Sequence, residues 1–577
     1  MSGSRPPCLP PLIALLIMDK LTKSISKIHP QLRQLIFILL ATLPVLAYVW
    51  NASVIHHNGI FGNEDWDYFM QLYEAARINI LQYHQFPWWN SWTMGGIPLF
   101  ANPQFGLISL QMPLVLIWGT VTGLHLSLIL YFVFGFWGMF LLLKRLGANS
   151  TLLQILLSYL FVFSGYVSWH LGYGHLTFGN YLLAPWFFLT LLNIREKNGW
   201  IWFSLAAAFL INQAPHYSMV QMLCIGFCVA IYQIIIYCKT QPRWIIVIRP
   251  YLWSASLLVL LAGPKLLYCF QYLHNYARFI FVEPAVPFGI TWAAITARHA
   301  VILHQFHAPV YAWQEYADYF GLITLLLFAT LLIIDFSRFR EITSRKWVLL
   351  GAIVLAFLVT LGAGFPFAPY PLLHELPLFR EMRVPSRWIG WFSFGVILYL
   401  AWLPKKPIIY FLLALSVIDV AYVNYPALNV PQTNYQPPVK NVNFQQYASY
   451  DYYPGKATYR LLKATQANRG DVYGYEPILF FAGDYQPEFV SSTDRCGINQ
   501  GCNFILTKNA KVIYWSPLKV LLQRTGKGNI KLNMNPGYDW SVNGKAIFSN
   551  ERILELKKPF LIIDPAQHIT VKYRPIP

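Results

Sequence analysis

The chain has 577 residues, of which 56% are hydrophobic and only 12% are charged, and its mean hydropathy is +0.43. This balance excludes an ordinary soluble domain. Aromatic residues make up 17% of the chain and cysteines number only 7, which excludes an intrinsically disordered chain and a disulfide scaffold. The net charge of +19 does not indicate nucleic acid, because basic residues in a membrane protein mainly set its topology. We therefore predict a polytopic α-helical membrane protein.

The apolar stretches recur along most of the chain. A bilayer core is crossed by roughly twenty apolar residues, or by somewhat fewer inside a bundle, and on that measure we predict about eleven transmembrane helices. They lie near residues 34–50, 121–143, 152–169, 180–193, 200–213, 217–237, 247–263, 319–334, 347–363, 388–403 and 407–424.

The distribution of Lys and Arg predicts the orientation of these helices. If the N-terminus is cytoplasmic, the short inner segments carry most of the basic residues and the longer outer loops carry few, as the positive-inside rule requires. We expect a cytoplasmic segment 1–33, a transmembrane domain 34–428 with a first outer loop 51–120, and a C-terminal region 429–577 outside the cytoplasm.

The composition changes after residue 428. Short runs of β-forming residues alternate with turn signals such as Asn535-Pro536-Gly537 and Asn543-Gly544, which predicts a small extracytoplasmic β-rich domain over 429–577. This domain contains the pair Cys496 and Cys502. In an oxidising compartment a close pair favours a disulfide, and two free thiols are the alternative.

The first outer loop begins with three acids, Glu64, Asp65 and Asp67. The residues that follow favour a helix, and helical spacing puts Glu64 and Asp67 on one side while Asp65 projects elsewhere. A carboxylate beside the membrane surface can take a proton from a hydroxyl or hold a divalent cation. A helix cap or a solvated turn is the competing interpretation.

An aromatic run follows in the same loop, from Phe86-Pro87-Trp88-Trp89-Asn90 to Ala101-Asn102-Pro103-Gln104. It contains too much Pro and Gly for a transmembrane helix, and too many aromatic residues for a flexible linker. We expect a structured interfacial loop in which Trp88 and Trp89 either form an aromatic belt or stack on sugar rings and prenyl chains.

Taken in order, these motifs resemble membrane glycosyltransferases of the GT-C class, and within them the YfhO-like family. The resemblance covers most of the chain. Besides the acids and the aromatic run, it rests on Gly174-His175, Pro215-His216-Tyr217, Gly263-Pro264-Lys265-Leu266, Glu315-Tyr316-Ala317-Asp318-Tyr319-Phe320-Gly321, Arg383-Val384-Pro385-Ser386-Arg387 and Tyr538-Asp539-Trp540-Ser541-Val542-Asn543-Gly544-Lys545.

The resemblance implies a GT-C-like fold, a polyprenyl-phosphate-linked sugar donor, and inverting transfer to a glycan or lipid acceptor on the outer side of the membrane. Within that scheme Asp65 is the favoured base, Asp67 is second and Glu64 assists, although the sequence does not separate them. A divalent cation such as Mg²⁺ or Mn²⁺ is an open question, with Asp65 and Asp67 as its candidate ligands.

A lipid phosphate needs cations at the membrane face, because removing a phosphate from water without compensation is costly. Few basic residues lie in the predicted outer loops, and the best placed are Lys265, Arg383 and Arg387. They are the candidate donor-phosphate ligands. Snorkelling of the side chains and pairing with Glu375 or Glu381 are the alternatives.

Other polar residues of the outer loops are candidates for acceptor or substrate binding, with helix starts and satisfied polar positions as the alternative. These candidates are Glu315, Asp318, His175 and His216. His304 and His307 are interpreted as structural. Asp419 lies inside the last predicted span, where we expect it to bond a neighbouring helix rather than to act in catalysis.

The sequence therefore predicts a glycosyltransferase of the bacterial inner membrane. A transporter or lipid-linked sugar flippase is the first alternative, although no internal repeat is evident and the charged candidates lie in loops rather than at the bilayer centre. A non-catalytic envelope scaffold is the second alternative.

Overall fold

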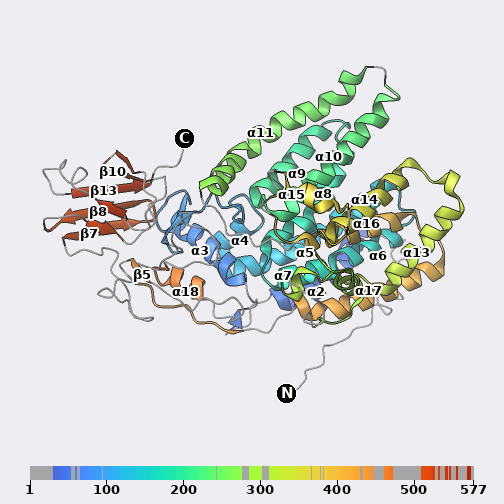
Figure 1. Cartoon of the computed structure of the whole chain (residues 1–577). Coiled ribbons are helices and arrows are strands. Elements are labelled where there is room, and N and C mark those ends of the chain that lie inside the picture. Colours follow the sequence, from blue (N-terminus) through green and yellow to red (C-terminus); the bar gives the residue numbers. More distant parts are fainter. Residues whose placement is uncertain are drawn as a thin grey trace.

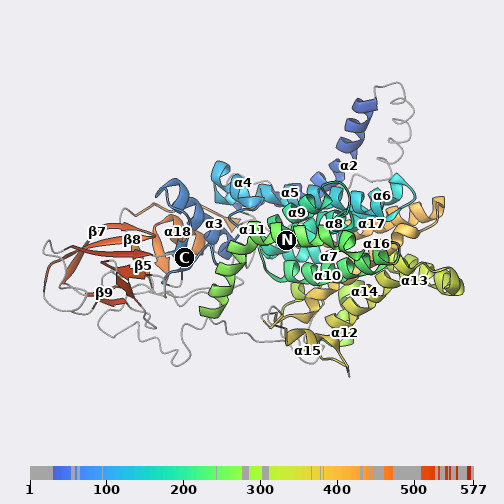
Figure 2. The same ribbon diagram turned by 90° about the horizontal axis from the view of Figure 1, so that it is seen from above.

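The helices of this protein form one region and most of its strands form another, with the segment that contains α3 (Trp66–Leu81) and α4 (Gln111–Trp118) between them (Figures 1 and 2). The computed structural model describes residues 30–53, 59–60, 65–93, 95–241, 243–275, 285–301, 311–365, 367–376, 379–380, 382–428, 433–441, 444–447, 460–471, 509–526, 530–532, 540–543, 545–547, 554–556 and 568–573. Glu64, His304, His307, Glu381, Cys496 and Cys502 lie outside the described residues.

The helical region is built mainly from apolar helices of very different lengths. The α-helices are α2 (Pro30–Ser53), α3 (Trp66–Leu81), α4 (Gln111–Trp118), α5 (Thr120–Leu146), α6 (Thr151–Val162), α7 (Gly165–Gly172), α8 (Gly179–Leu192), α9 (Gly199–Gln213), α10 (Tyr217–Cys238), α11 (Trp244–Asn275), α12 (Phe288–Thr296), α13 (Leu322–Ser337), α14 (Ser344–Thr360), α15 (Pro369–His374), α16 (Ile389–Tyr399), α17 (Pro407–Leu428) and α18 (Arg460–Gln466). Short 3-10 turns include η1 (Leu176–Phe178), η3 (Trp313–Glu315), η4 (Phe339–Glu341), η5 (Pro385–Trp388) and η6 (Leu400–Trp402).

Helix α5 lies at the centre of this region and packs against α2, α4, α6 and α8. It ends at Gly147, whose φ of +91° provides the left-handed C-cap that glycine favours. Helix α6 then begins with a side-chain cap, because the Ser150 hydroxyl accepts a hydrogen bond from the Leu153 amide at 3.2 Å. The two helices therefore form a tight antiparallel pair, and α17 packs against α6 and α7.

Each predicted membrane-spanning window contains a helix, but the helices differ in length. Five helical stretches of the described residues are long and apolar enough to cross a bilayer. They are Thr120–Leu146, Thr151–Gly172, Tyr217–Cys238, Trp244–His274 and Pro407–Leu428. The protein is thus a mostly helical membrane protein by length and composition of its helices, and the count of about eleven crossings stays a prediction.

The window 152–169 is interrupted in the structure, where α6 gives way to α7. Gly165 donates its backbone N–H to the Tyr319 carbonyl at 2.9 Å, and a Cβ at this position would lie 2.5 Å from the Tyr319 nitrogen. The break therefore lets the chain around residue 319 approach the helix. That approach brings η3 and its polar residues toward α7.

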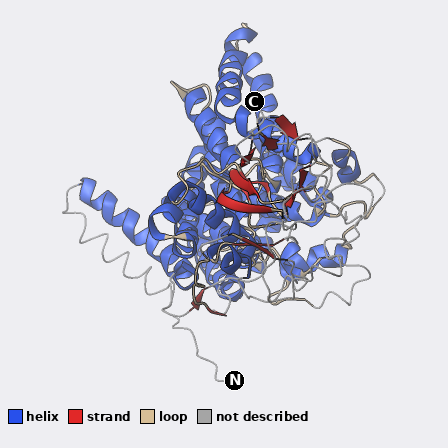
Figure 3. Cartoon of the chain, turned by 90° about the vertical axis from the view of Figure 1, so that its left-hand side faces the viewer, coloured by secondary structure: helices blue, strands red, loops and turns tan. Residues whose placement is uncertain are grey.

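The strands lie mainly after residue 508. They are β1 (Gly59–Ile60), β2 (Trp89–Asn90), β3 (Ile97–Pro98), β4 (Thr433–Asn434), β5 (Gln445–Tyr447), β6 (Arg469–Asp471), β7 (Ala510–Ser516), β8 (Lys519–Arg524), β9 (Ile530–Leu532), β10 (Trp540–Val542), β11 (Lys545–Ile547), β12 (Leu554–Leu556) and β13 (His568–Tyr573). An antiparallel sheet has the order β11-β10-β13-β8-β7, and it stands in front of the helices in Figure 3. Whether 429–577 is a separate extracytoplasmic domain stays a prediction.

The aromatic run that begins at Phe86 packs against this C-terminal region. Trp89 in β2 is buried, and its ring centroid lies 5.6 Å from that of Trp540 and 5.3 Å from that of Tyr573. Trp92 donates its indole N–H to the Asn468 side-chain oxygen at 3.2 Å. Trp89 and Trp92 are thus used in packing against the C-terminal region, which explains part of the aromatic content of this run.

Candidate active site

Asp65 stands at the start of α3, next to the turn that follows α7. Its backbone N–H donates to the Tyr173 carbonyl at 3.2 Å. Its side chain is 15% exposed, and its Oδ2 atom lies 3.4 Å from Nε2 of His175. Two residues that the sequence singles out from distant loops, the first acid and the Gly174-His175 pair, are therefore in contact.

Glycine is required at position 174 for this contact. Gly174 has a φ of +89°, and a Cβ there would lie 2.2 Å from the Trp66 nitrogen and 2.6 Å from the Asp65 carbonyl carbon. The Trp66 indole N–H also donates to the carbonyls of Leu171 and Gly172, at 3.0 and 3.1 Å. The C-terminal end of α7 is thereby fixed against the first turn of α3.

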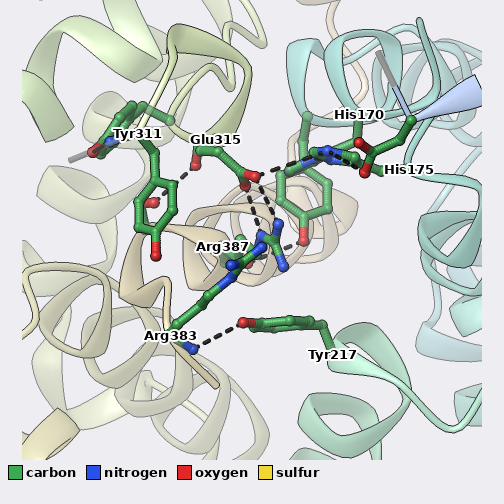
Figure 4. A network of polar contacts seen from close by, with 11 residues as sticks. His170, His175, Tyr217, Tyr311, Glu315, Arg383 and Arg387 are labelled. Carbon is green, nitrogen blue, oxygen red and sulfur yellow. Dashed lines mark hydrogen bonds and ion pairs between the residues drawn. The ribbon is translucent and has the colours of Figure 1, made fainter. Parts of the chain in front are cut away.

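A buried ion pair lies on the other side of His175. Arg387 of η5 donates from Nε and Nη2 to the two carboxylate oxygens of Glu315 in η3, both at 2.7 Å. The side chains are only 5% and 8% exposed. His175 Nε2 lies 3.8 Å from Glu315 Oε1, so Asp65, His175, Glu315 and Arg387 form a continuous polar cluster (Figure 4).

Rings and backbone atoms hold the Arg387 guanidinium in place. Its central carbon lies 4.1 Å from the ring centroid of Tyr217 and 5.1 Å from that of Phe178. The Ser386 hydroxyl donates to the Glu315 carbonyl at 2.8 Å. The Arg387–Glu315 pair is therefore bidentate and is supported by ring contacts and by a second hydrogen bond between η3 and η5. This geometry stabilises a buried ion pair.

Burial and neighbouring charges determine the protonation of the cluster. Burial alone would raise the pKa of Glu315, but the charge and hydrogen bonds of Arg387, together with the two neighbouring histidines, outweigh burial and hold that pKa well below its ordinary value. Burial lowers the pKa of His175 from 6.5 to about 4, against the opposing effect of Glu315. Near neutral pH the cluster therefore contains an ionised pair and an uncharged imidazole.

His170 completes the cluster from inside α7. Its Nδ1 lies 2.7 Å from Nδ1 of His175, so one ring must donate and the other accept. His175 Nε2 faces the carboxylates of Asp65 and Glu315, which favours the tautomer with hydrogen on Nε2. We infer from this network that His170 donates from Nδ1 and that His175 donates toward the carboxylates.

His170, His175 and Glu315 each offer an atom that could hold a metal ion, and these atoms lie within 4.8 Å of one another. The sequence leaves open whether Mg²⁺ or Mn²⁺ is bound, and the arrangement of these three residues does not suit either ion. These ions prefer oxygen ligands, and both oxygens of Glu315 already accept from Arg387. The two Nδ1 atoms at 2.7 Å are also closer than the roughly 3.3 Å between two nitrogens on a tetrahedral zinc.

Arg383 lies at the edge of the cluster, between Tyr217 and Tyr311 (Figure 4). Its backbone N–H donates to the Tyr217 hydroxyl at 2.8 Å, and its guanidinium carbon lies 5.6 Å from the Tyr311 ring centroid. The side chain is half-buried. Among the described residues its guanidinium makes no hydrogen bond or ion pair, so this cation has its donors available.

Asp318 lies in the same segment as Glu315, but it is directed into the protein. It is fully buried, and its Oδ1 accepts the Tyr166 backbone N–H at 3.3 Å. Burial raises the pKa of Asp318 well above its ordinary value, against hydrogen bonds from Ser393 and Tyr166. The Tyr166 hydroxyl in turn donates to the Arg387 carbonyl at 3.1 Å. Asp318 thus supports the backbone around the ion pair.

Asp67 and Lys265 are engaged elsewhere. The two carboxylate oxygens of Asp67 accept the backbone N–H groups of Leu461 and Leu462 in α18, both at 2.9 Å. The Lys265 ammonium donates to the carbonyls of Phe100, Asn102 and Phe105, at 2.6, 3.0 and 2.9 Å. Three acceptors match its three protons. None of these hydrogen bonds connects Asp67 or Lys265 to the Glu315–Arg387 pair.

The remaining candidates take part in packing. The Trp88 ring contacts Phe86, Phe100 and Tyr268. His216 precedes α10 and lies 4.5 Å from the Tyr217 ring, centroid to centroid. Asp419 pairs with Arg298 at 2.5 Å and accepts from the Tyr319 hydroxyl, so these bonds join it to residues just outside α12 and α13 and not to a neighbouring helix.

Sequence reasoning missed His170, Tyr166 and Tyr311. His170 had a signal, because it lies five residues before His175 in a chain with only 14 histidines. No sequence feature distinguished Tyr166 and Tyr311 from the other tyrosines, because the chain contains 36. Their roles depend on contacts with segments far away in the sequence.

The comparisons with known proteins give distant similarities only. No family model and no curated protein matches the chain. Among solved structures it is similar to the arabinofuranosyltransferase AftD from Mycobacteria, with 14% identity and a TM-score of 0.48 over 77% of this chain and 32% of that one. It is also similar to the oligosaccharyltransferase of Archaeoglobus fulgidus, with 12% identity and a TM-score of 0.38 over 76% of this chain and 62% of that one.

A further similar structure is that of the oligosaccharyltransferase AglB from Archaeoglobus fulgidus in complex with an inhibitory peptide and a dolichol-phosphate, with 13% identity and a TM-score of 0.35. That match covers 76% of this chain and 64% of the other. The chain therefore spans less than two thirds of each of these proteins. All three structures are of membrane glycosyltransferases, but likenesses this distant carry no argument, and the proposals below rest on the side chains of this protein.

Proposed function

We propose that this protein is a membrane glycosyltransferase that moves a sugar from a polyprenyl-phosphate-linked donor to a glycan or lipid acceptor. One observation carries the proposal. The acid favoured from the sequence, Asp65, lies at the end of a polar cluster that contains Glu315 and Arg387, with the available cation Arg383 at its edge. An acid and a cation on one site are what transfer from a glycosyl phosphate requires.

In this mechanism the Asp65 carboxylate accepts the proton of the acceptor hydroxyl. The hydroxyl oxygen forms a bond to the anomeric carbon as the bond from that carbon to the phosphate oxygen breaks, with inversion. The electron pair leaves with the phosphate, and the proton on Asp65 passes to water. His175 donates from Nε2 to the carboxylate and orients it, since the two atoms are 3.4 Å apart.

The arginines would stabilise the departing lipid phosphate. Among the described residues, Glu315 accepts from Nε and Nη2 of Arg387, which leaves Nη1 of that side chain for another acceptor. Among the described residues the Arg383 guanidinium makes no hydrogen bond or ion pair. We therefore assign the larger share of phosphate binding to Arg383, and we assign to Arg387 the task of keeping a positive charge beside it.

We propose that the reaction needs no Mg²⁺ or Mn²⁺. The oxygens of Asp67 accept from α18 and those of Glu315 accept from Arg387. Of these three carboxylates that of Asp65 is the most exposed, with 15% of its side chain accessible against 8% for Glu315 and for Asp67. The arginines carry the charge that a metal ion would otherwise supply.

We further propose the expected topology: N-terminus in the cytoplasm, Asp65 and the region 429–577 outside, and the chain in the bacterial inner membrane as a member of the YfhO-like branch. The position of the basic residues and the quoted motifs support this. Cysteine labelling tests it, with Gln82→Cys after α3 and Lys405→Cys before α17. A membrane-impermeant reagent should label intact cells at residue 82 and not at residue 405.

The direct test of the function compares Asp65→Asn with Glu375→Gln, a second acid-to-amide change at a carboxylate that is 79% exposed. Both proteins are purified at equal folded yield. With polyprenyl-phosphate-linked sugars as donors, the Asp65 variant should transfer at least about 100-fold more slowly, because a general base is lost. Equal rates for both variants would refute the proposal.

A further inference from the structure

The first turn of α3 is held from three directions. Asp65 contacts His175, Trp66 donates its indole N–H to the end of α7, and Asp67 accepts two N–H groups from α18. These are three consecutive residues. A displacement of His175, of the end of α7 or of α18 would therefore shift the first turn of α3 and the Asp65 side chain with it.

The contact made by Asp67 is a helix cap supplied from nearly 400 residues away in the chain. The amides of Leu461 and Leu462 belong to the first turn of α18, where backbone N–H groups have no partner within the helix. An ionised carboxylate satisfies two of them and complements the positive end of the helix. Asp67 is only 8% exposed, so water does not compete readily for these bonds.

Other contacts fix the surroundings of α18 on the same loop. Trp92 bonds Asn468, two residues beyond the end of α18, and the Gln85 amide donates to the Ser516 hydroxyl at 3.2 Å. Leu461 and Leu462 are themselves buried. The C-terminal region therefore stays attached when Asp67 is changed, and the effect of such a change remains local to α18 and α3.

We infer that Asp67 is a positioning residue that couples α18 of the C-terminal region to Asp65, and that it is not the base. This inference rests on the proposed function, in which Asp65 is the catalytic base. Its consequence is that the C-terminal region forms part of the machinery that sets the rate of transfer. Movement of α18, for example when an acceptor binds that region, would be transmitted to Asp65 through the Asp67 carboxylate.

The test uses the full-length protein and two readouts. Hydrogen exchange measured on peptides covering 460–466 reports the cap whether or not the protein is an enzyme. In Asp67→Ala we expect exchange there to rise at least about tenfold, because two buried donors lose their acceptor. Exchange in β8 should stay unchanged. Asp67→Asn keeps one acceptor oxygen and should show an intermediate effect.

Kinetics provide the second readout. In Asp67→Ala we expect kcat to fall about ten- to hundredfold through misplacement of Asp65, with the KM for the donor changed by less than about twofold. Asp67→Asn should recover most of kcat, and Glu375→Gln should match the unmodified protein.

Two results would overturn the inference. Unchanged exchange at 460–466 in Asp67→Ala would show that the cap does not order α18, and raised exchange with an unchanged kcat would show that α18 is not coupled to Asp65. If the unmodified protein transfers no sugar from any polyprenyl phosphate, the proposed function fails, while the exchange experiment still decides whether the cap exists.

Discussion

Asp65 and Asp67 are separated by one residue, yet they belong to two regions that are built differently. Asp65 contacts a side-chain cluster of the helical region. In that cluster Arg387 and Glu315 balance each other's charge, and His175 is uncharged. Asp67 accepts two backbone N–H groups of the C-terminal region. The Asp65 carboxylate is therefore partly exposed beside the arginines. In Asp67, by contrast, each carboxylate oxygen accepts a backbone N–H.

This difference teaches that an acidic run in an outer loop is not a single functional unit. Helical geometry sends residues two positions apart to different sides, so each acid takes the chemistry of the segment it faces. One side of α3 faces a polar cluster suited to catalysis, and the other faces a helix end suited to capping. The predictions below test this division, beginning with the largest expected effect.

Removing the cation of the cluster should have the largest effect. Arg387→Ala leaves Glu315 buried without its partner, which typically costs about 3–5 kcal/mol. We expect a strong loss of thermal stability in detergent, measured by the unfolding midpoint. The double variant Arg387→Met, Glu315→Leu should recover much of that stability while remaining inactive. A stable, active Arg387→Ala protein would contradict the central position of this pair.

Acid should destabilise the cluster through His175. Its pKa is lowered from 6.5 to about 4, so between these values the unfolded chain binds a proton that the folded chain does not. Stability is therefore complete above pH 6.5 and falls as the pH drops toward 4, by about 3 kcal/mol in total. Protonation of Glu315 would destabilise the fold at a lower pH than that of His175, because Arg387 holds the pKa of Glu315 below its ordinary value.

The measurement is the unfolding midpoint at several pH values from 7 to 4.5, in the unmodified protein and in His175→Gln. The glutamine variant should show a smaller slope, because the titrating group is gone. Identical slopes in the two proteins would mean that His175 is not held neutral by the cluster.

Arg383 should affect the donor and not the fold. Arg383→Ala removes a half-buried cation whose guanidinium makes no ion pair among the described residues, so the unfolding midpoint should change little. The KM for the lipid-linked donor should rise about tenfold, as for one lost charge-assisted hydrogen bond. Arg380→Ala is the control, since Arg380 is 66% exposed and pairs at 3.7 Å with Glu375. Equal effects of the two variants would remove Arg383 from the phosphate site.

Removal of divalent cations should have the smallest effect. If the arginines supply the charge that stabilises the leaving phosphate, treatment with EDTA should change the transfer rate by less than about twofold. The assay is repeated after adding back Mg²⁺, Mn²⁺ and Zn²⁺ separately. Loss of activity with EDTA and its recovery with one ion would contradict the metal-independent mechanism.

Much of the candidate site was predictable because polar residues are scarce in this sequence. With only 12% charged residues, Glu315 and Arg387 stand out in the predicted outer loops, whereas Asp65 is favoured through the resemblance and His175 belongs to one of its motifs. Their pairing was not predictable. Glu315 was assigned to the acceptor, whereas it contacts Arg387 across 72 residues of sequence, and no local pattern encodes that contact.

The fold shows the same division between local and long-range signals. Hydropathy located the helices, since each predicted window contains one. It missed α4, α12 and α15, because helices of nine residues or fewer are shorter than the window that detects a membrane span. The break between α6 and α7 depends on the approach of Tyr319 to Gly165, which is likewise a long-range contact.

The most direct measurement compares the glycans or lipids modified by cells that carry Asp65→Asn, Asp67→Asn or the unmodified chain, each at the same membrane level and each quantified by mass spectrometry. The account predicts that modification disappears with the Asp65 variant and is largely kept with the Asp67 variant, whose side chain still offers one acceptor oxygen to α18. Full modification with Asp65→Asn, or loss with Asp67→Asn alone, would contradict it.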